Sequence, residues 1–381
     1  MLPRGFVPGG LLLNRASGGR ASDPAPVVVV GGGQSGLAAA RVLREFHVPT
    51  VILEAGHRAA GSWPHYYDSL ESFSPAGYSS LPGMAFPGEP DHYPGRDEVA
   101  GYLERYAATL DVEIETDTRV ETIRQDGRAF LVHTEDGREV PASGIVAASG
   151  SFSNPYRPRF PGEDTFTGEL SHVADYRNPT PYTRKRVVVV GAGDSAAQVA
   201  NELAPLAKVT IASRHPVRFI PQRLGGKDVH YWFRETGFDT LPAVWLSKIT
   251  GGSVVTDSVG FEQTLAEGRV DRRPMFTTLD RGQVVWSDSQ REPVDAIILA
   301  TGYRPSLRYL RELGALDQDG APRHVGGISS THIGLVYVGL EFQRSYASNT
   351  LRGVSEDASA VIAPLVAWIG DAPRRVGLGS S

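Results

Sequence analysis

The sequence predicts an α/β fold organised around two copies of a strand–turn–helix unit. Residues 27–36 read VVVVGGGQSG and residues 187–196 read VVVVGAGDSA, so each copy is a run of four valines followed by Gly-x-Gly-x-x-Gly or Gly-x-Gly-x-x-Ala. A run of β-branched residues is typical of a strand buried on both faces of a parallel sheet. The glycines permit a tight turn, and the first N–H groups of the following helix favour a phosphate. The repeat predicts two Rossmann-like dinucleotide-binding domains.

Bulk composition excludes several classes of protein. The chain has 381 residues, enough for two domains, and its net charge of −5 offers no basic surface for nucleic acid. No apolar run approaches the roughly 20 residues that cross a bilayer. The absence of cysteine excludes a disulfide reductase and thiolate metal ligands. We expect a cytoplasmic protein, monomeric or homodimeric, that binds no membrane, nucleic acid or metal.

The two ends of the chain read as tails outside the fold. Residues 1–25 contain three arginines and no acid before Asp23, and the apolar run Leu11–Leu13 is too short for the core of a signal peptide. Residues 371–381 end in Gly-Leu-Gly-Ser-Ser. We predict that both segments are disordered.

The first unit contains an acidic residue where a ribose would bind. Its turn and the start of its helix supply the candidate cofactor-binding residues Gly31, Gly33, Gln34, Ser35 and Gly36. Thr50–Leu53 is the next predicted buried strand, and it ends at Glu54. An acid about 20 residues past the glycines binds ribose hydroxyls and repels a 2′-phosphate. This site therefore fits the unphosphorylated ribose of FAD or NAD.

The rest of the first domain alternates helix and strand. Gly61-Ser62-Trp63 is followed by an irregular stretch, residues 67–83, which we expect to be a functional loop or an ordinary surface loop. The pattern then predicts a helix over Asp97–Leu110 and a β meander, followed by a buried strand over Gly144–Ala148. The predicted meander strands are Val120–Ile123, Ala129–His133 and one around Val140. Gly61-Ser62-Trp63 resembles the Gly-Gly-x-Trp segment that flavoprotein monooxygenases lay along FAD, which implies that these three residues bind the cofactor. Val120 and Gly150 are further candidate cofactor-binding residues.

The second unit ends in a basic residue instead of an acidic one. Its candidate cofactor-binding residues are Gly191, Gly193, Asp194, Ser195 and Ala196, and its helix is predicted to continue to Ala204. The next strand, Val209–Ala212, runs into Ser213 and Arg214. Arginine pairs well with a 2′-phosphate, so this site is predicted to prefer NADPH, the alternative being an ordinary surface arginine.

The remainder of the chain contains fewer signals. Residues 216–286 hold aromatic and basic residues together. We interpret most of them as packing, with the alternative that some line the substrate entrance, and we assign no substrate residue. A predicted buried strand, Ala296–Ala300, leads to Thr301 and Gly302, two further candidate cofactor-binding residues. A strand over Leu335–Val338 and a helix over Glu356–Trp368 complete the fold.

One motif carries a family resemblance. Residues 166–176 read FTGELSHVADY and fit Phe-x-Gly-x-x-x-His-x-x-x-Tyr, the identifying sequence of flavin-containing monooxygenases. Together with both glycine turns, the Gly-Ser-Trp segment and Ala300-Thr301-Gly302-Tyr303, this motif makes the chain resemble class B flavin monooxygenases. Within that group it resembles the YUCCA-type enzymes of plants and the flavin monooxygenases of bacterial arsenic operons. The resemblance covers Pro26 to about Ala367.

The resemblance implies a domain arrangement and a reaction. FAD would bind a domain made of residues 26–157 and 303–370, and NADPH a domain of residues 158–302 inserted between them. NADPH would reduce FAD, O2 would add as a C4a-hydroperoxyflavin, and one oxygen atom would pass to a small organic substrate by N-, S- or C-oxygenation. Baeyer–Villiger members usually carry Trp where Tyr176 stands, which favours oxygenation of a heteroatom.

The resemblance also implies roles for individual residues. His172 and Tyr176 would position the nicotinamide half of the coenzyme. The stretch before the last helix would close over the flavin, with Ser348, Asn349, Thr350 and Leu351 as candidates. We take His172, Tyr176 and Asn349 as the candidate catalytic residues.

Three alternative functions stay open. The first is a flavin NADPH oxidase or reductase, and the second is a Baeyer–Villiger monooxygenase. The third is a flavin-bearing redox sensor or regulatory subunit, against which two complete coenzyme sites argue.

Overall fold

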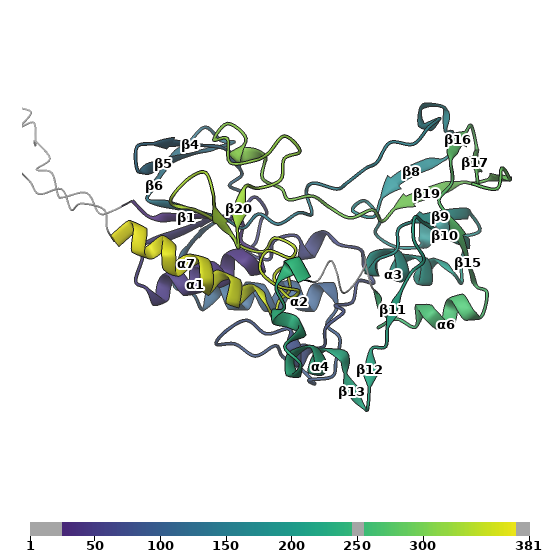
Figure 1. Ribbon diagram of the computed structural model, residues 1–381, viewed down its shortest axis with the longest axis horizontal. Helices are drawn as coiled ribbons and strands as arrows, with labels where there is room; N and C mark the ends of the chain where they lie inside the picture. Colours follow the sequence, from purple (N-terminus) through teal and green to yellow (C-terminus); the bar gives the residue numbers. More distant parts are fainter. Residues whose placement is uncertain (1–24, 246–254, 371–381) are drawn as a thin grey trace, which may run out of the picture.

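The chain forms two lobes that lie side by side (Figure 1). The computed structural model describes residues 25–245 and 255–370, so both predicted tails lie outside the described residues apart from position 25. One lobe contains β1, α1 and α7, and the other contains β9, β10 and α3 (Figure 1). Each lobe is built on its own parallel sheet.

The first sheet has seven strands in the order β20-β21-β22-β7-β1-β2-β3. The strands from β22 to β3 are parallel, whereas β20 and β21 pair antiparallel at one edge. Their bounds are β1 Val27–Val30, β2 Thr50–Leu53, β3 Glu113–Glu115, β7 Gly144–Ala147, β20 His324–Val325, β21 Ile328–Ser329 and β22 Leu335–Tyr337. The last three strands come from the C-terminal part of the chain, so this sheet is assembled from two separate segments.

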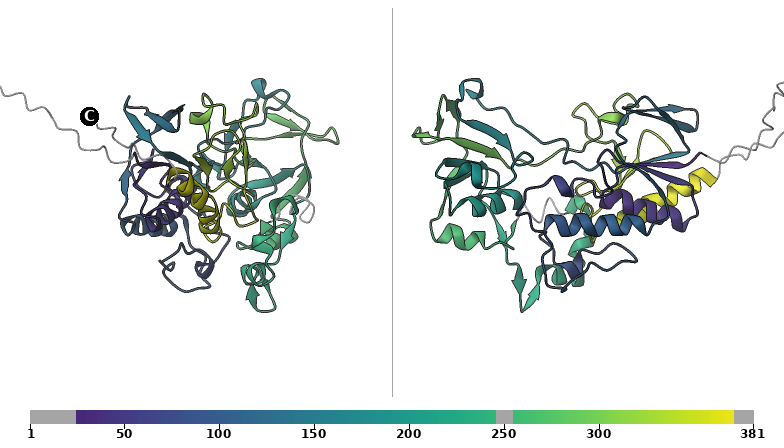
Figure 2. Two further views of the ribbon diagram at one scale, coloured as in Figure 1. Left: turned by 60° about the vertical axis from the view of Figure 1, so that its left-hand side comes forward. Right: turned by 180° about the vertical axis from the view of Figure 1, so that it is seen from behind.

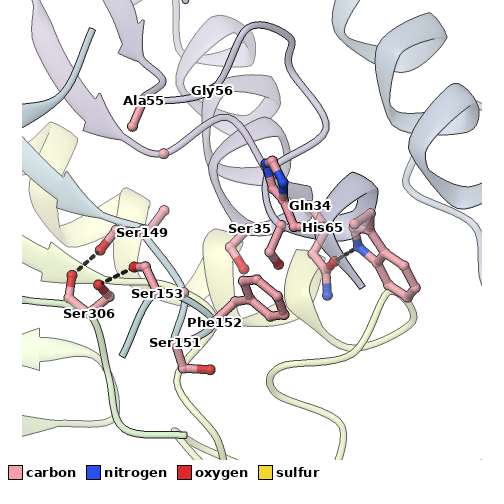
Figure 3. A pocket seen from close by; sticks show the side chains of 18 of the residues that line it. Gln34, Ser35, Ala55, Gly56, His65, Ser149, Ser151, Phe152, Ser153 and Ser306 are labelled. Atoms are coloured by element: carbon pink, nitrogen blue, oxygen red, sulfur yellow. Dashed lines mark hydrogen bonds between the residues drawn. The ribbon is translucent and has the colours of Figure 1, made fainter. Parts of the chain in front are cut away.

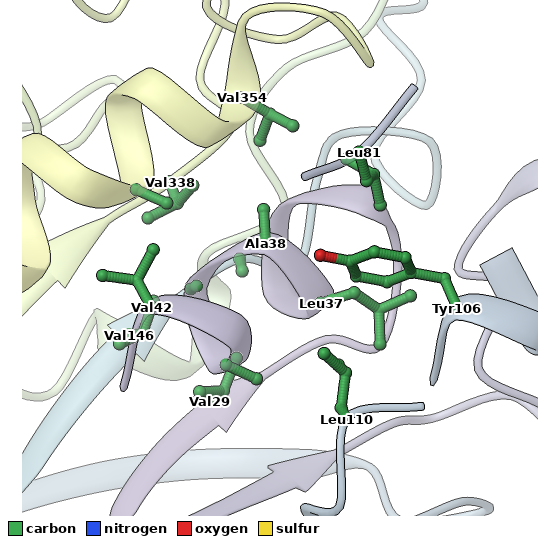
Figure 4. Packing of buried hydrophobic residues seen from close by; sticks show 14 of the residues in the cluster. Val29, Leu37, Ala38, Val42, Leu81, Tyr106, Leu110, Val146, Val338 and Val354 are labelled. Carbon is green, nitrogen blue, oxygen red and sulfur yellow. The ribbon is translucent and has the colours of Figure 1, made fainter. Parts of the chain in front are cut away.

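The four valines of β1 explain why this strand forms the centre of the lobe. Val27 and Val29 face a core shared with three helices, α1 (Gln34–Glu45), α2 (Arg96–Ala108) and α7 (Val354–Gly370). Figure 4 shows Val29 beneath Leu37, Ala38 and Val42 of α1, with Val354 of α7 beyond them. Alternate valines point to opposite faces of a strand, so both faces are covered and the strand is apolar throughout.

The opposite face of this sheet is covered by a small antiparallel sheet. Val28 and Val30 pack against β4 (Val120–Asp126) and β5 (Ala129–Thr134) and against η6 (Arg308–Leu310). The third strand of that small sheet is β6, Glu139–Ala142. Helices and the antiparallel sheet therefore lie on opposite sides of the seven-stranded sheet (Figures 1 and 2).

The second sheet repeats this three-layer plan. Its five parallel strands run in the order β15-β10-β9-β19-β8, with bounds β8 Glu169–His172, β9 Arg186–Val190, β10 Lys208–Ser213, β15 Val270–Pro274 and β19 Ala296–Leu299. One face packs on α3 (Asp194–Leu203) and α6 (Phe261–Ala266). The other packs on the three-stranded sheet of β16 (Thr278–Asp280), β17 (Gln283–Val285) and β18 (Arg291–Pro293). All these strands lie between the two segments that form the first sheet, so the second lobe is inserted in the first.

A further insertion within the second lobe reaches back towards the first. It contains β11 (Phe219–Ile220), β12 (Arg223–Leu224), β13 (Lys227–Asp228) and α4 (Val229–Glu235), and β14 (Val255–Thr256) follows it. The β12–β13 hairpin projects from the molecule near the junction of the lobes (Figures 1 and 2). The guanidinium of Arg352, just before α7, holds both carboxylate oxygens of Asp239 in this insertion, at 2.9 and 2.8 Å.

Most predicted elements are confirmed, with shifts at their ends. The strand Thr50–Leu53 is β2 as predicted. The helix predicted over Asp97–Leu110 is α2, which begins at Arg96 because Glu98 accepts a hydrogen bond from the N–H of Gly95 and caps it. The strands β3 and β8 were not predicted, since each is short and carries charged residues.

Candidate active site

A large cavity joins the two lobes. Its volume is about 1370 Å³, and it extends from the carboxyl ends of β1, β2 and β7 to the N-terminus of α3. Pockets for drug-sized ligands are typically about 300–1,000 Å³, so this one has room for more than a small substrate. Ligands of parallel α/β sheets bind at this end of the strands. The cavity is therefore the candidate active site.

The first glycine turn brings the backbone close to the cavity. Gly31 has φ of +108°, and a Cβ added there would lie 2.6 Å from the carbonyl oxygen of Ala148. A Cβ on Gly36 would lie 1.9 Å from the carbonyl oxygen of Gly31. Gly61 has φ of +56°, and its added Cβ would lie 2.7 Å from the Cα of Gly33. These positions exclude side chains and leave Gly31, Gly33 and Gly61 in the cavity wall.

Glu54 lies where the sequence places it, at the end of β2 and in the cavity wall. Oε2 accepts a hydrogen bond from the N–H of Gly32, and Oε1 accepts one from the N–H of Gly56 at 2.7 Å. The carboxylate is buried and is held by the turn that follows β1. An acceptor of this kind suits the hydroxyls of a ribose.

Gln34 links three predicted site segments. Its Oε1 accepts a hydrogen bond from Nε1 of Trp63 at 2.6 Å, and its Nε2 donates to the carbonyl oxygen of Asn349 at 2.9 Å. A dashed line in Figure 3 marks the hydrogen bond that the Gln34 side chain accepts from the indole. All three residues line the cavity, so the stretch before α7 contacts the first turn, and its closure over a flavin stays a prediction.

The far side of the cavity is polar and comes from the connection between the lobes. The hydroxyl of Ser149 donates to the carbonyl oxygen of Ser306 at 2.8 Å, and the hydroxyls of Ser153 and Ser306 lie 2.6 Å apart (Figure 3). Phe152 projects into the same space (Figure 3). Gly150 lies here with φ of +65°.

Fifteen of the predicted cofactor and catalytic residues line this one cavity. They are Gly31, Gly33, Gln34, Ser35, Glu54, Gly61, Ser62, Trp63, Val120, Gly150, Asp194, Ser195, Asn349, Thr350 and Leu351. The residues Gly36, Gly191, Gly193, Ala196, Ser213, Arg214, Thr301, Gly302, His172 and Tyr176 are not in its wall. The structure thus brings together the first turn, the start of α3 and the segment before α7.

The second turn repeats the close packing of the first. A Cβ on Gly191 would lie 2.4 Å from the carbonyl oxygen of Ala300 at the end of β19, whereas Gly193 is open. Asp194 and Ser195 begin α3 and face the cavity. Arg214 is exposed just beyond β10 and outside the cavity wall. The hydroxyl of Ser213 donates to the carbonyl oxygen of His215 at 2.6 Å.

His172 is a fully buried residue of the strand end and does not reach the cavity. The Nε2–H of its ring donates to the carbonyl oxygen of Gly302 at 3.2 Å, and Nδ1 accepts from the N–H of Ala174 at 3.1 Å. Its ring lies edge-on to Tyr303 at 5.1 Å. Burial lowers the pKa of His172, which favours the neutral ring. These contacts point to a positioning role, and direct contact with a reacting group stays a prediction.

Tyr176 is likewise buried, and its hydroxyl donates to Glu202 of α3 at 2.8 Å. Burial raises its pKa, so the phenol stays neutral. Its ring contacts Tyr67, which lines the cavity and donates a hydrogen bond to Oε1 of Gln198 at 2.8 Å. The linker motif therefore packs directly against the junction of the lobes.

Sequence reasoning missed part of the cavity wall. His65, Tyr66 and Tyr67 follow the Gly-Ser-Trp segment, and Phe152 and Gln198 come from two other elements. Only the irregular character of residues 67–83 hinted at a functional loop. No local pattern links Tyr67 with Gln198, because they lie far apart in the chain and meet only when the lobes pack together.

Comparison with known proteins identifies the family. A model of the family "Pyridine nucleotide-disulphide oxidoreductase" matches residues 28–339. The chain belongs to this family. It is 32% identical over 341 residues to an uncharacterised CzcO-like oxidoreductase of Geobacillus kaustophilus, covering 88% of this chain and 97% of the relative. It is 30% identical to the indole-3-pyruvate monooxygenase YUCCA1 of Oryza sativa, covering 76% of this chain and 79% of that one.

Solved structures place the chain within the flavin monooxygenases of this family. The fold matches a flavin-containing monooxygenase from Stenotrophomonas maltophilia with a TM-score of 0.81 and 29% identity, over 91% of this chain and 99% of that one. The predicted class B resemblance and the two-domain α/β fold are confirmed. The protein is a flavoprotein monooxygenase, an oxidoreductase that uses a flavin and a nicotinamide nucleotide.

Two further observations concern the residues that the structure describes. Among residues 25–245 and 255–370, no helix is both long and apolar enough to cross a membrane. Within the same described ranges, no three His, Cys, Asp or Glu side chains gather in a way that could hold a metal ion.

Proposed function

We propose that the protein is an NADPH- and O2-dependent monooxygenase that binds FAD in the first lobe and oxygenates a small organic molecule. The observation that carries the proposal is one continuous cavity whose wall includes both the first glycine turn and the start of α3. A flavin held by the first turn and a nicotinamide held against α3 would then share the same cavity. Hydride transfer needs such proximity of the two rings.

The two lobes are suited to different nucleotides. Glu54, buried with both oxygens held by backbone N–H groups, favours an unphosphorylated ribose and supports FAD in residues 26–157 and 303–370. Arg214, exposed at the end of β10, supports a 2′-phosphate and hence NADPH in residues 158–302.

The protein's own residues bind and orient the cofactors and the substrate, and they exclude water from the cavity. When bound, the flavin supplies the electron transfer and the activation of O2. Gln34 holds Trp63 and the Asn349 segment together over the first turn, which narrows access of water to the cavity. His172 and Tyr176 hold the linker against Gly302 and α3, so we assign them the task of keeping the two lobes in register.

The proposal extends to the class of substrate that is oxygenated. YUCCA1 acts on indole-3-pyruvate by its name, whereas the CzcO-like relative is uncharacterised. We propose heteroatom oxygenation ahead of Baeyer–Villiger oxidation, because Tyr176 stands where Baeyer–Villiger members usually carry Trp. A panel of one sulfide, one tertiary amine and one cyclic ketone separates these outcomes.

A labelling experiment tests the proposal. The FAD-loaded enzyme is supplied with NADPH, ¹⁸O2 and each member of the panel, and NADPH consumed, peroxide formed and product are measured together. A monooxygenase places one ¹⁸O atom in the product and the other in water. Consumption of NADPH with stoichiometric peroxide across the whole panel would instead favour the oxidase alternative. Absence of any NADPH turnover by the FAD-loaded protein would favour a redox sensor.

A further inference from the structure

Asp194 places an acid at the helix end where a coenzyme phosphate would bind. It is the first residue of α3, directly after Gly193 of the second glycine turn, and it lines the cavity. One carboxylate oxygen accepts a hydrogen bond from the N–H of Thr256 in β14 at 3.2 Å, and the carboxylate also accepts one from the N–H of Asp194 itself. The side chain therefore occupies an N–H group that a dinucleotide pyrophosphate would use.

No cation neutralises this carboxylate among residues 25–245 and 255–370: none of the ion pairs found there includes Asp194. Burial in the cavity wall raises the pKa of Asp194 to about 7, although the two backbone N–H groups lower it. Near neutral pH the side chain is thus divided between the acid and the carboxylate.

Several other titratable groups face this end of the cavity. The wall opposite α3 contributes His65, Tyr66, Tyr67 and Glu71 from η1 (Trp63–His65) and the segment after it. Tyr346, from the loop before α7, interacts electrostatically with Asp194, as does Tyr67. Beside β14, Arg218 accepts a hydrogen bond from Val255 at its carbonyl, and Asp257 follows Thr256. Burial keeps Tyr67 and Tyr346 neutral by raising their pKa values, so neither provides a compensating charge.

We propose that Asp194 must carry a proton for the coenzyme pyrophosphate to bind at α3, so that coenzyme binding is coupled to the uptake of one proton. This inference rests on the proposed function in assigning a nicotinamide dinucleotide to the second turn. A carboxylate and a pyrophosphate at one helix N-terminus repel each other, whereas a protonated carboxyl donates a hydrogen bond to a phosphate oxygen. The acid therefore acts as a pH-sensitive determinant of coenzyme affinity.

The required protonation of Asp194 determines how coenzyme affinity changes with pH. Below about pH 7 most molecules hold the proton already, and binding meets no penalty from Asp194. Above it, each unit of pH lowers the protonated fraction tenfold, so the dissociation constant should rise by up to about tenfold per unit. The 2′-phosphate of NADP⁺ itself titrates near pH 6, as phosphate monoesters do, so pH 7–9 isolates the contribution of Asp194.

Calorimetry on the FAD-loaded protein tests the coupling. NADP⁺ is titrated into wild type, Asp194→Asn and Asp257→Asn at pH 8 in two buffers of different ionisation enthalpy, which reports protons taken up per coenzyme. Asparagine keeps the acceptor oxygen for Thr256 but cannot titrate. Asp257 is the matched control, because it also accepts from backbone N–H groups at a helix start, those of Phe261 and Glu262, but lies outside the cavity wall.

The expected results are specific. Wild type and Asp257→Asn take up close to one proton per NADP⁺, Asp194→Asn takes up almost none, and at pH 9 Asp194→Asn binds at least tenfold more tightly than wild type. FAD content and thermal midpoint establish that each variant is folded. Tight binding without proton uptake in wild type, or unchanged uptake in Asp194→Asn, would overturn the inference. Failure of wild type to bind NADP⁺ at any pH would overturn the proposed function, and this inference with it.

Discussion

The Nε2–H of His172 donates to the carbonyl oxygen of Gly302, 3.2 Å away, and this bond joins the end of β8 to the segment that follows β19. Both strands belong to the second sheet. After β8 the chain continues to β9 of the same sheet, whereas after β19 it returns to the first lobe, so the bond ties the end of β8 to that returning connection. His172 lies outside the cavity wall, so these contacts support the proposed role of positioning the lobes.

His172→Ala should uncouple the reaction while leaving flavin bound. The substitution removes a buried ring and two hydrogen bonds at the lobe connection, so the two ends of the cavity lose their fixed spacing. Peroxide formed per NADPH consumed should rise, with FAD content unchanged. His92→Ala, at an exposed pair with Glu98, is the control. Unchanged coupling in folded His172→Ala would argue against this role.

Glu54→Gln should weaken flavin binding. The carboxylate accepts hydrogen bonds from the N–H groups of Gly32 and Gly56 with its two oxygens, whereas a glutamine side chain has only one acceptor oxygen. A hydrogen bond to a charged group contributes about 1.5–3 kcal/mol. FAD affinity should fall on the order of 10–100-fold, measured by flavin fluorescence on reconstitution of the apoprotein. Glu45→Gln on the surface of α1 is the control and should retain wild-type affinity. Retention of full affinity in Glu54→Gln would contradict the assigned ribose contact.

Asp239→Asn should destabilise the protein far more than a surface substitution. The Asp239–Arg352 pair has side chains only 14% and 9% exposed, and loss of one buried partner costs about 3–5 kcal/mol. Glu312→Gln breaks the pair with Arg124, whose side chains are 60% and 64% exposed, and should cost no more than about 1 kcal/mol. Urea denaturation measures the free energy of unfolding of both variants. Equal midpoints would mean that the insertion does not depend on this ion pair.

Arg214→Ala should reduce the preference for NADPH. Loss of a charge-assisted contact to a 2′-phosphate lowers affinity by about 1.5–3 kcal/mol, which is on the order of 10–100-fold, whereas affinity for NADH should hardly change. Binding of both coenzymes is measured by calorimetry. Lys208→Ala, an exposed cation at the opposite end of β10, should leave both affinities unchanged. An equal loss for the two coenzymes would remove Arg214 from this role.

Stability should fall on mild acidification. Burial lowers the pKa values of His172, His230 and His324 from 6.5, so the unfolded chain binds protons that the folded chain does not. The contribution of these neutral histidines to the free energy of unfolding is therefore fully present above about pH 6.5 and is lost as pH falls below it. The thermal midpoint should drop between pH 7.5 and 5.5. His324→Gln should flatten this profile and His215→Gln, at an exposed position, should not. A midpoint independent of pH would contradict the prediction.

Local sequence was sufficient for the parts of the fold that depend on short patterns. Val27–Val30 and Val187–Val190 are buried on both faces as predicted, because four β-branched residues suit only the interior of a parallel sheet. Gly31 and Glu54 lie at the ends of their strands, since a glycine turn and the next strand end are separated by a single helix. These relations span few residues, and the chain geometry alone determines them.

The contacts that complete the candidate site depend on the packing of distant segments. Tyr67 meets Gln198 and Gln34 meets Asn349 across long stretches of chain, and no periodicity records either pairing. Tertiary structure also decides that His172 faces a backbone carbonyl and that Asp194 faces the cavity. Sequence determines which residues can form a turn, a strand or a charge. Only the docking of the lobes determines which of them lose water and meet, because burial is a property of the assembled core.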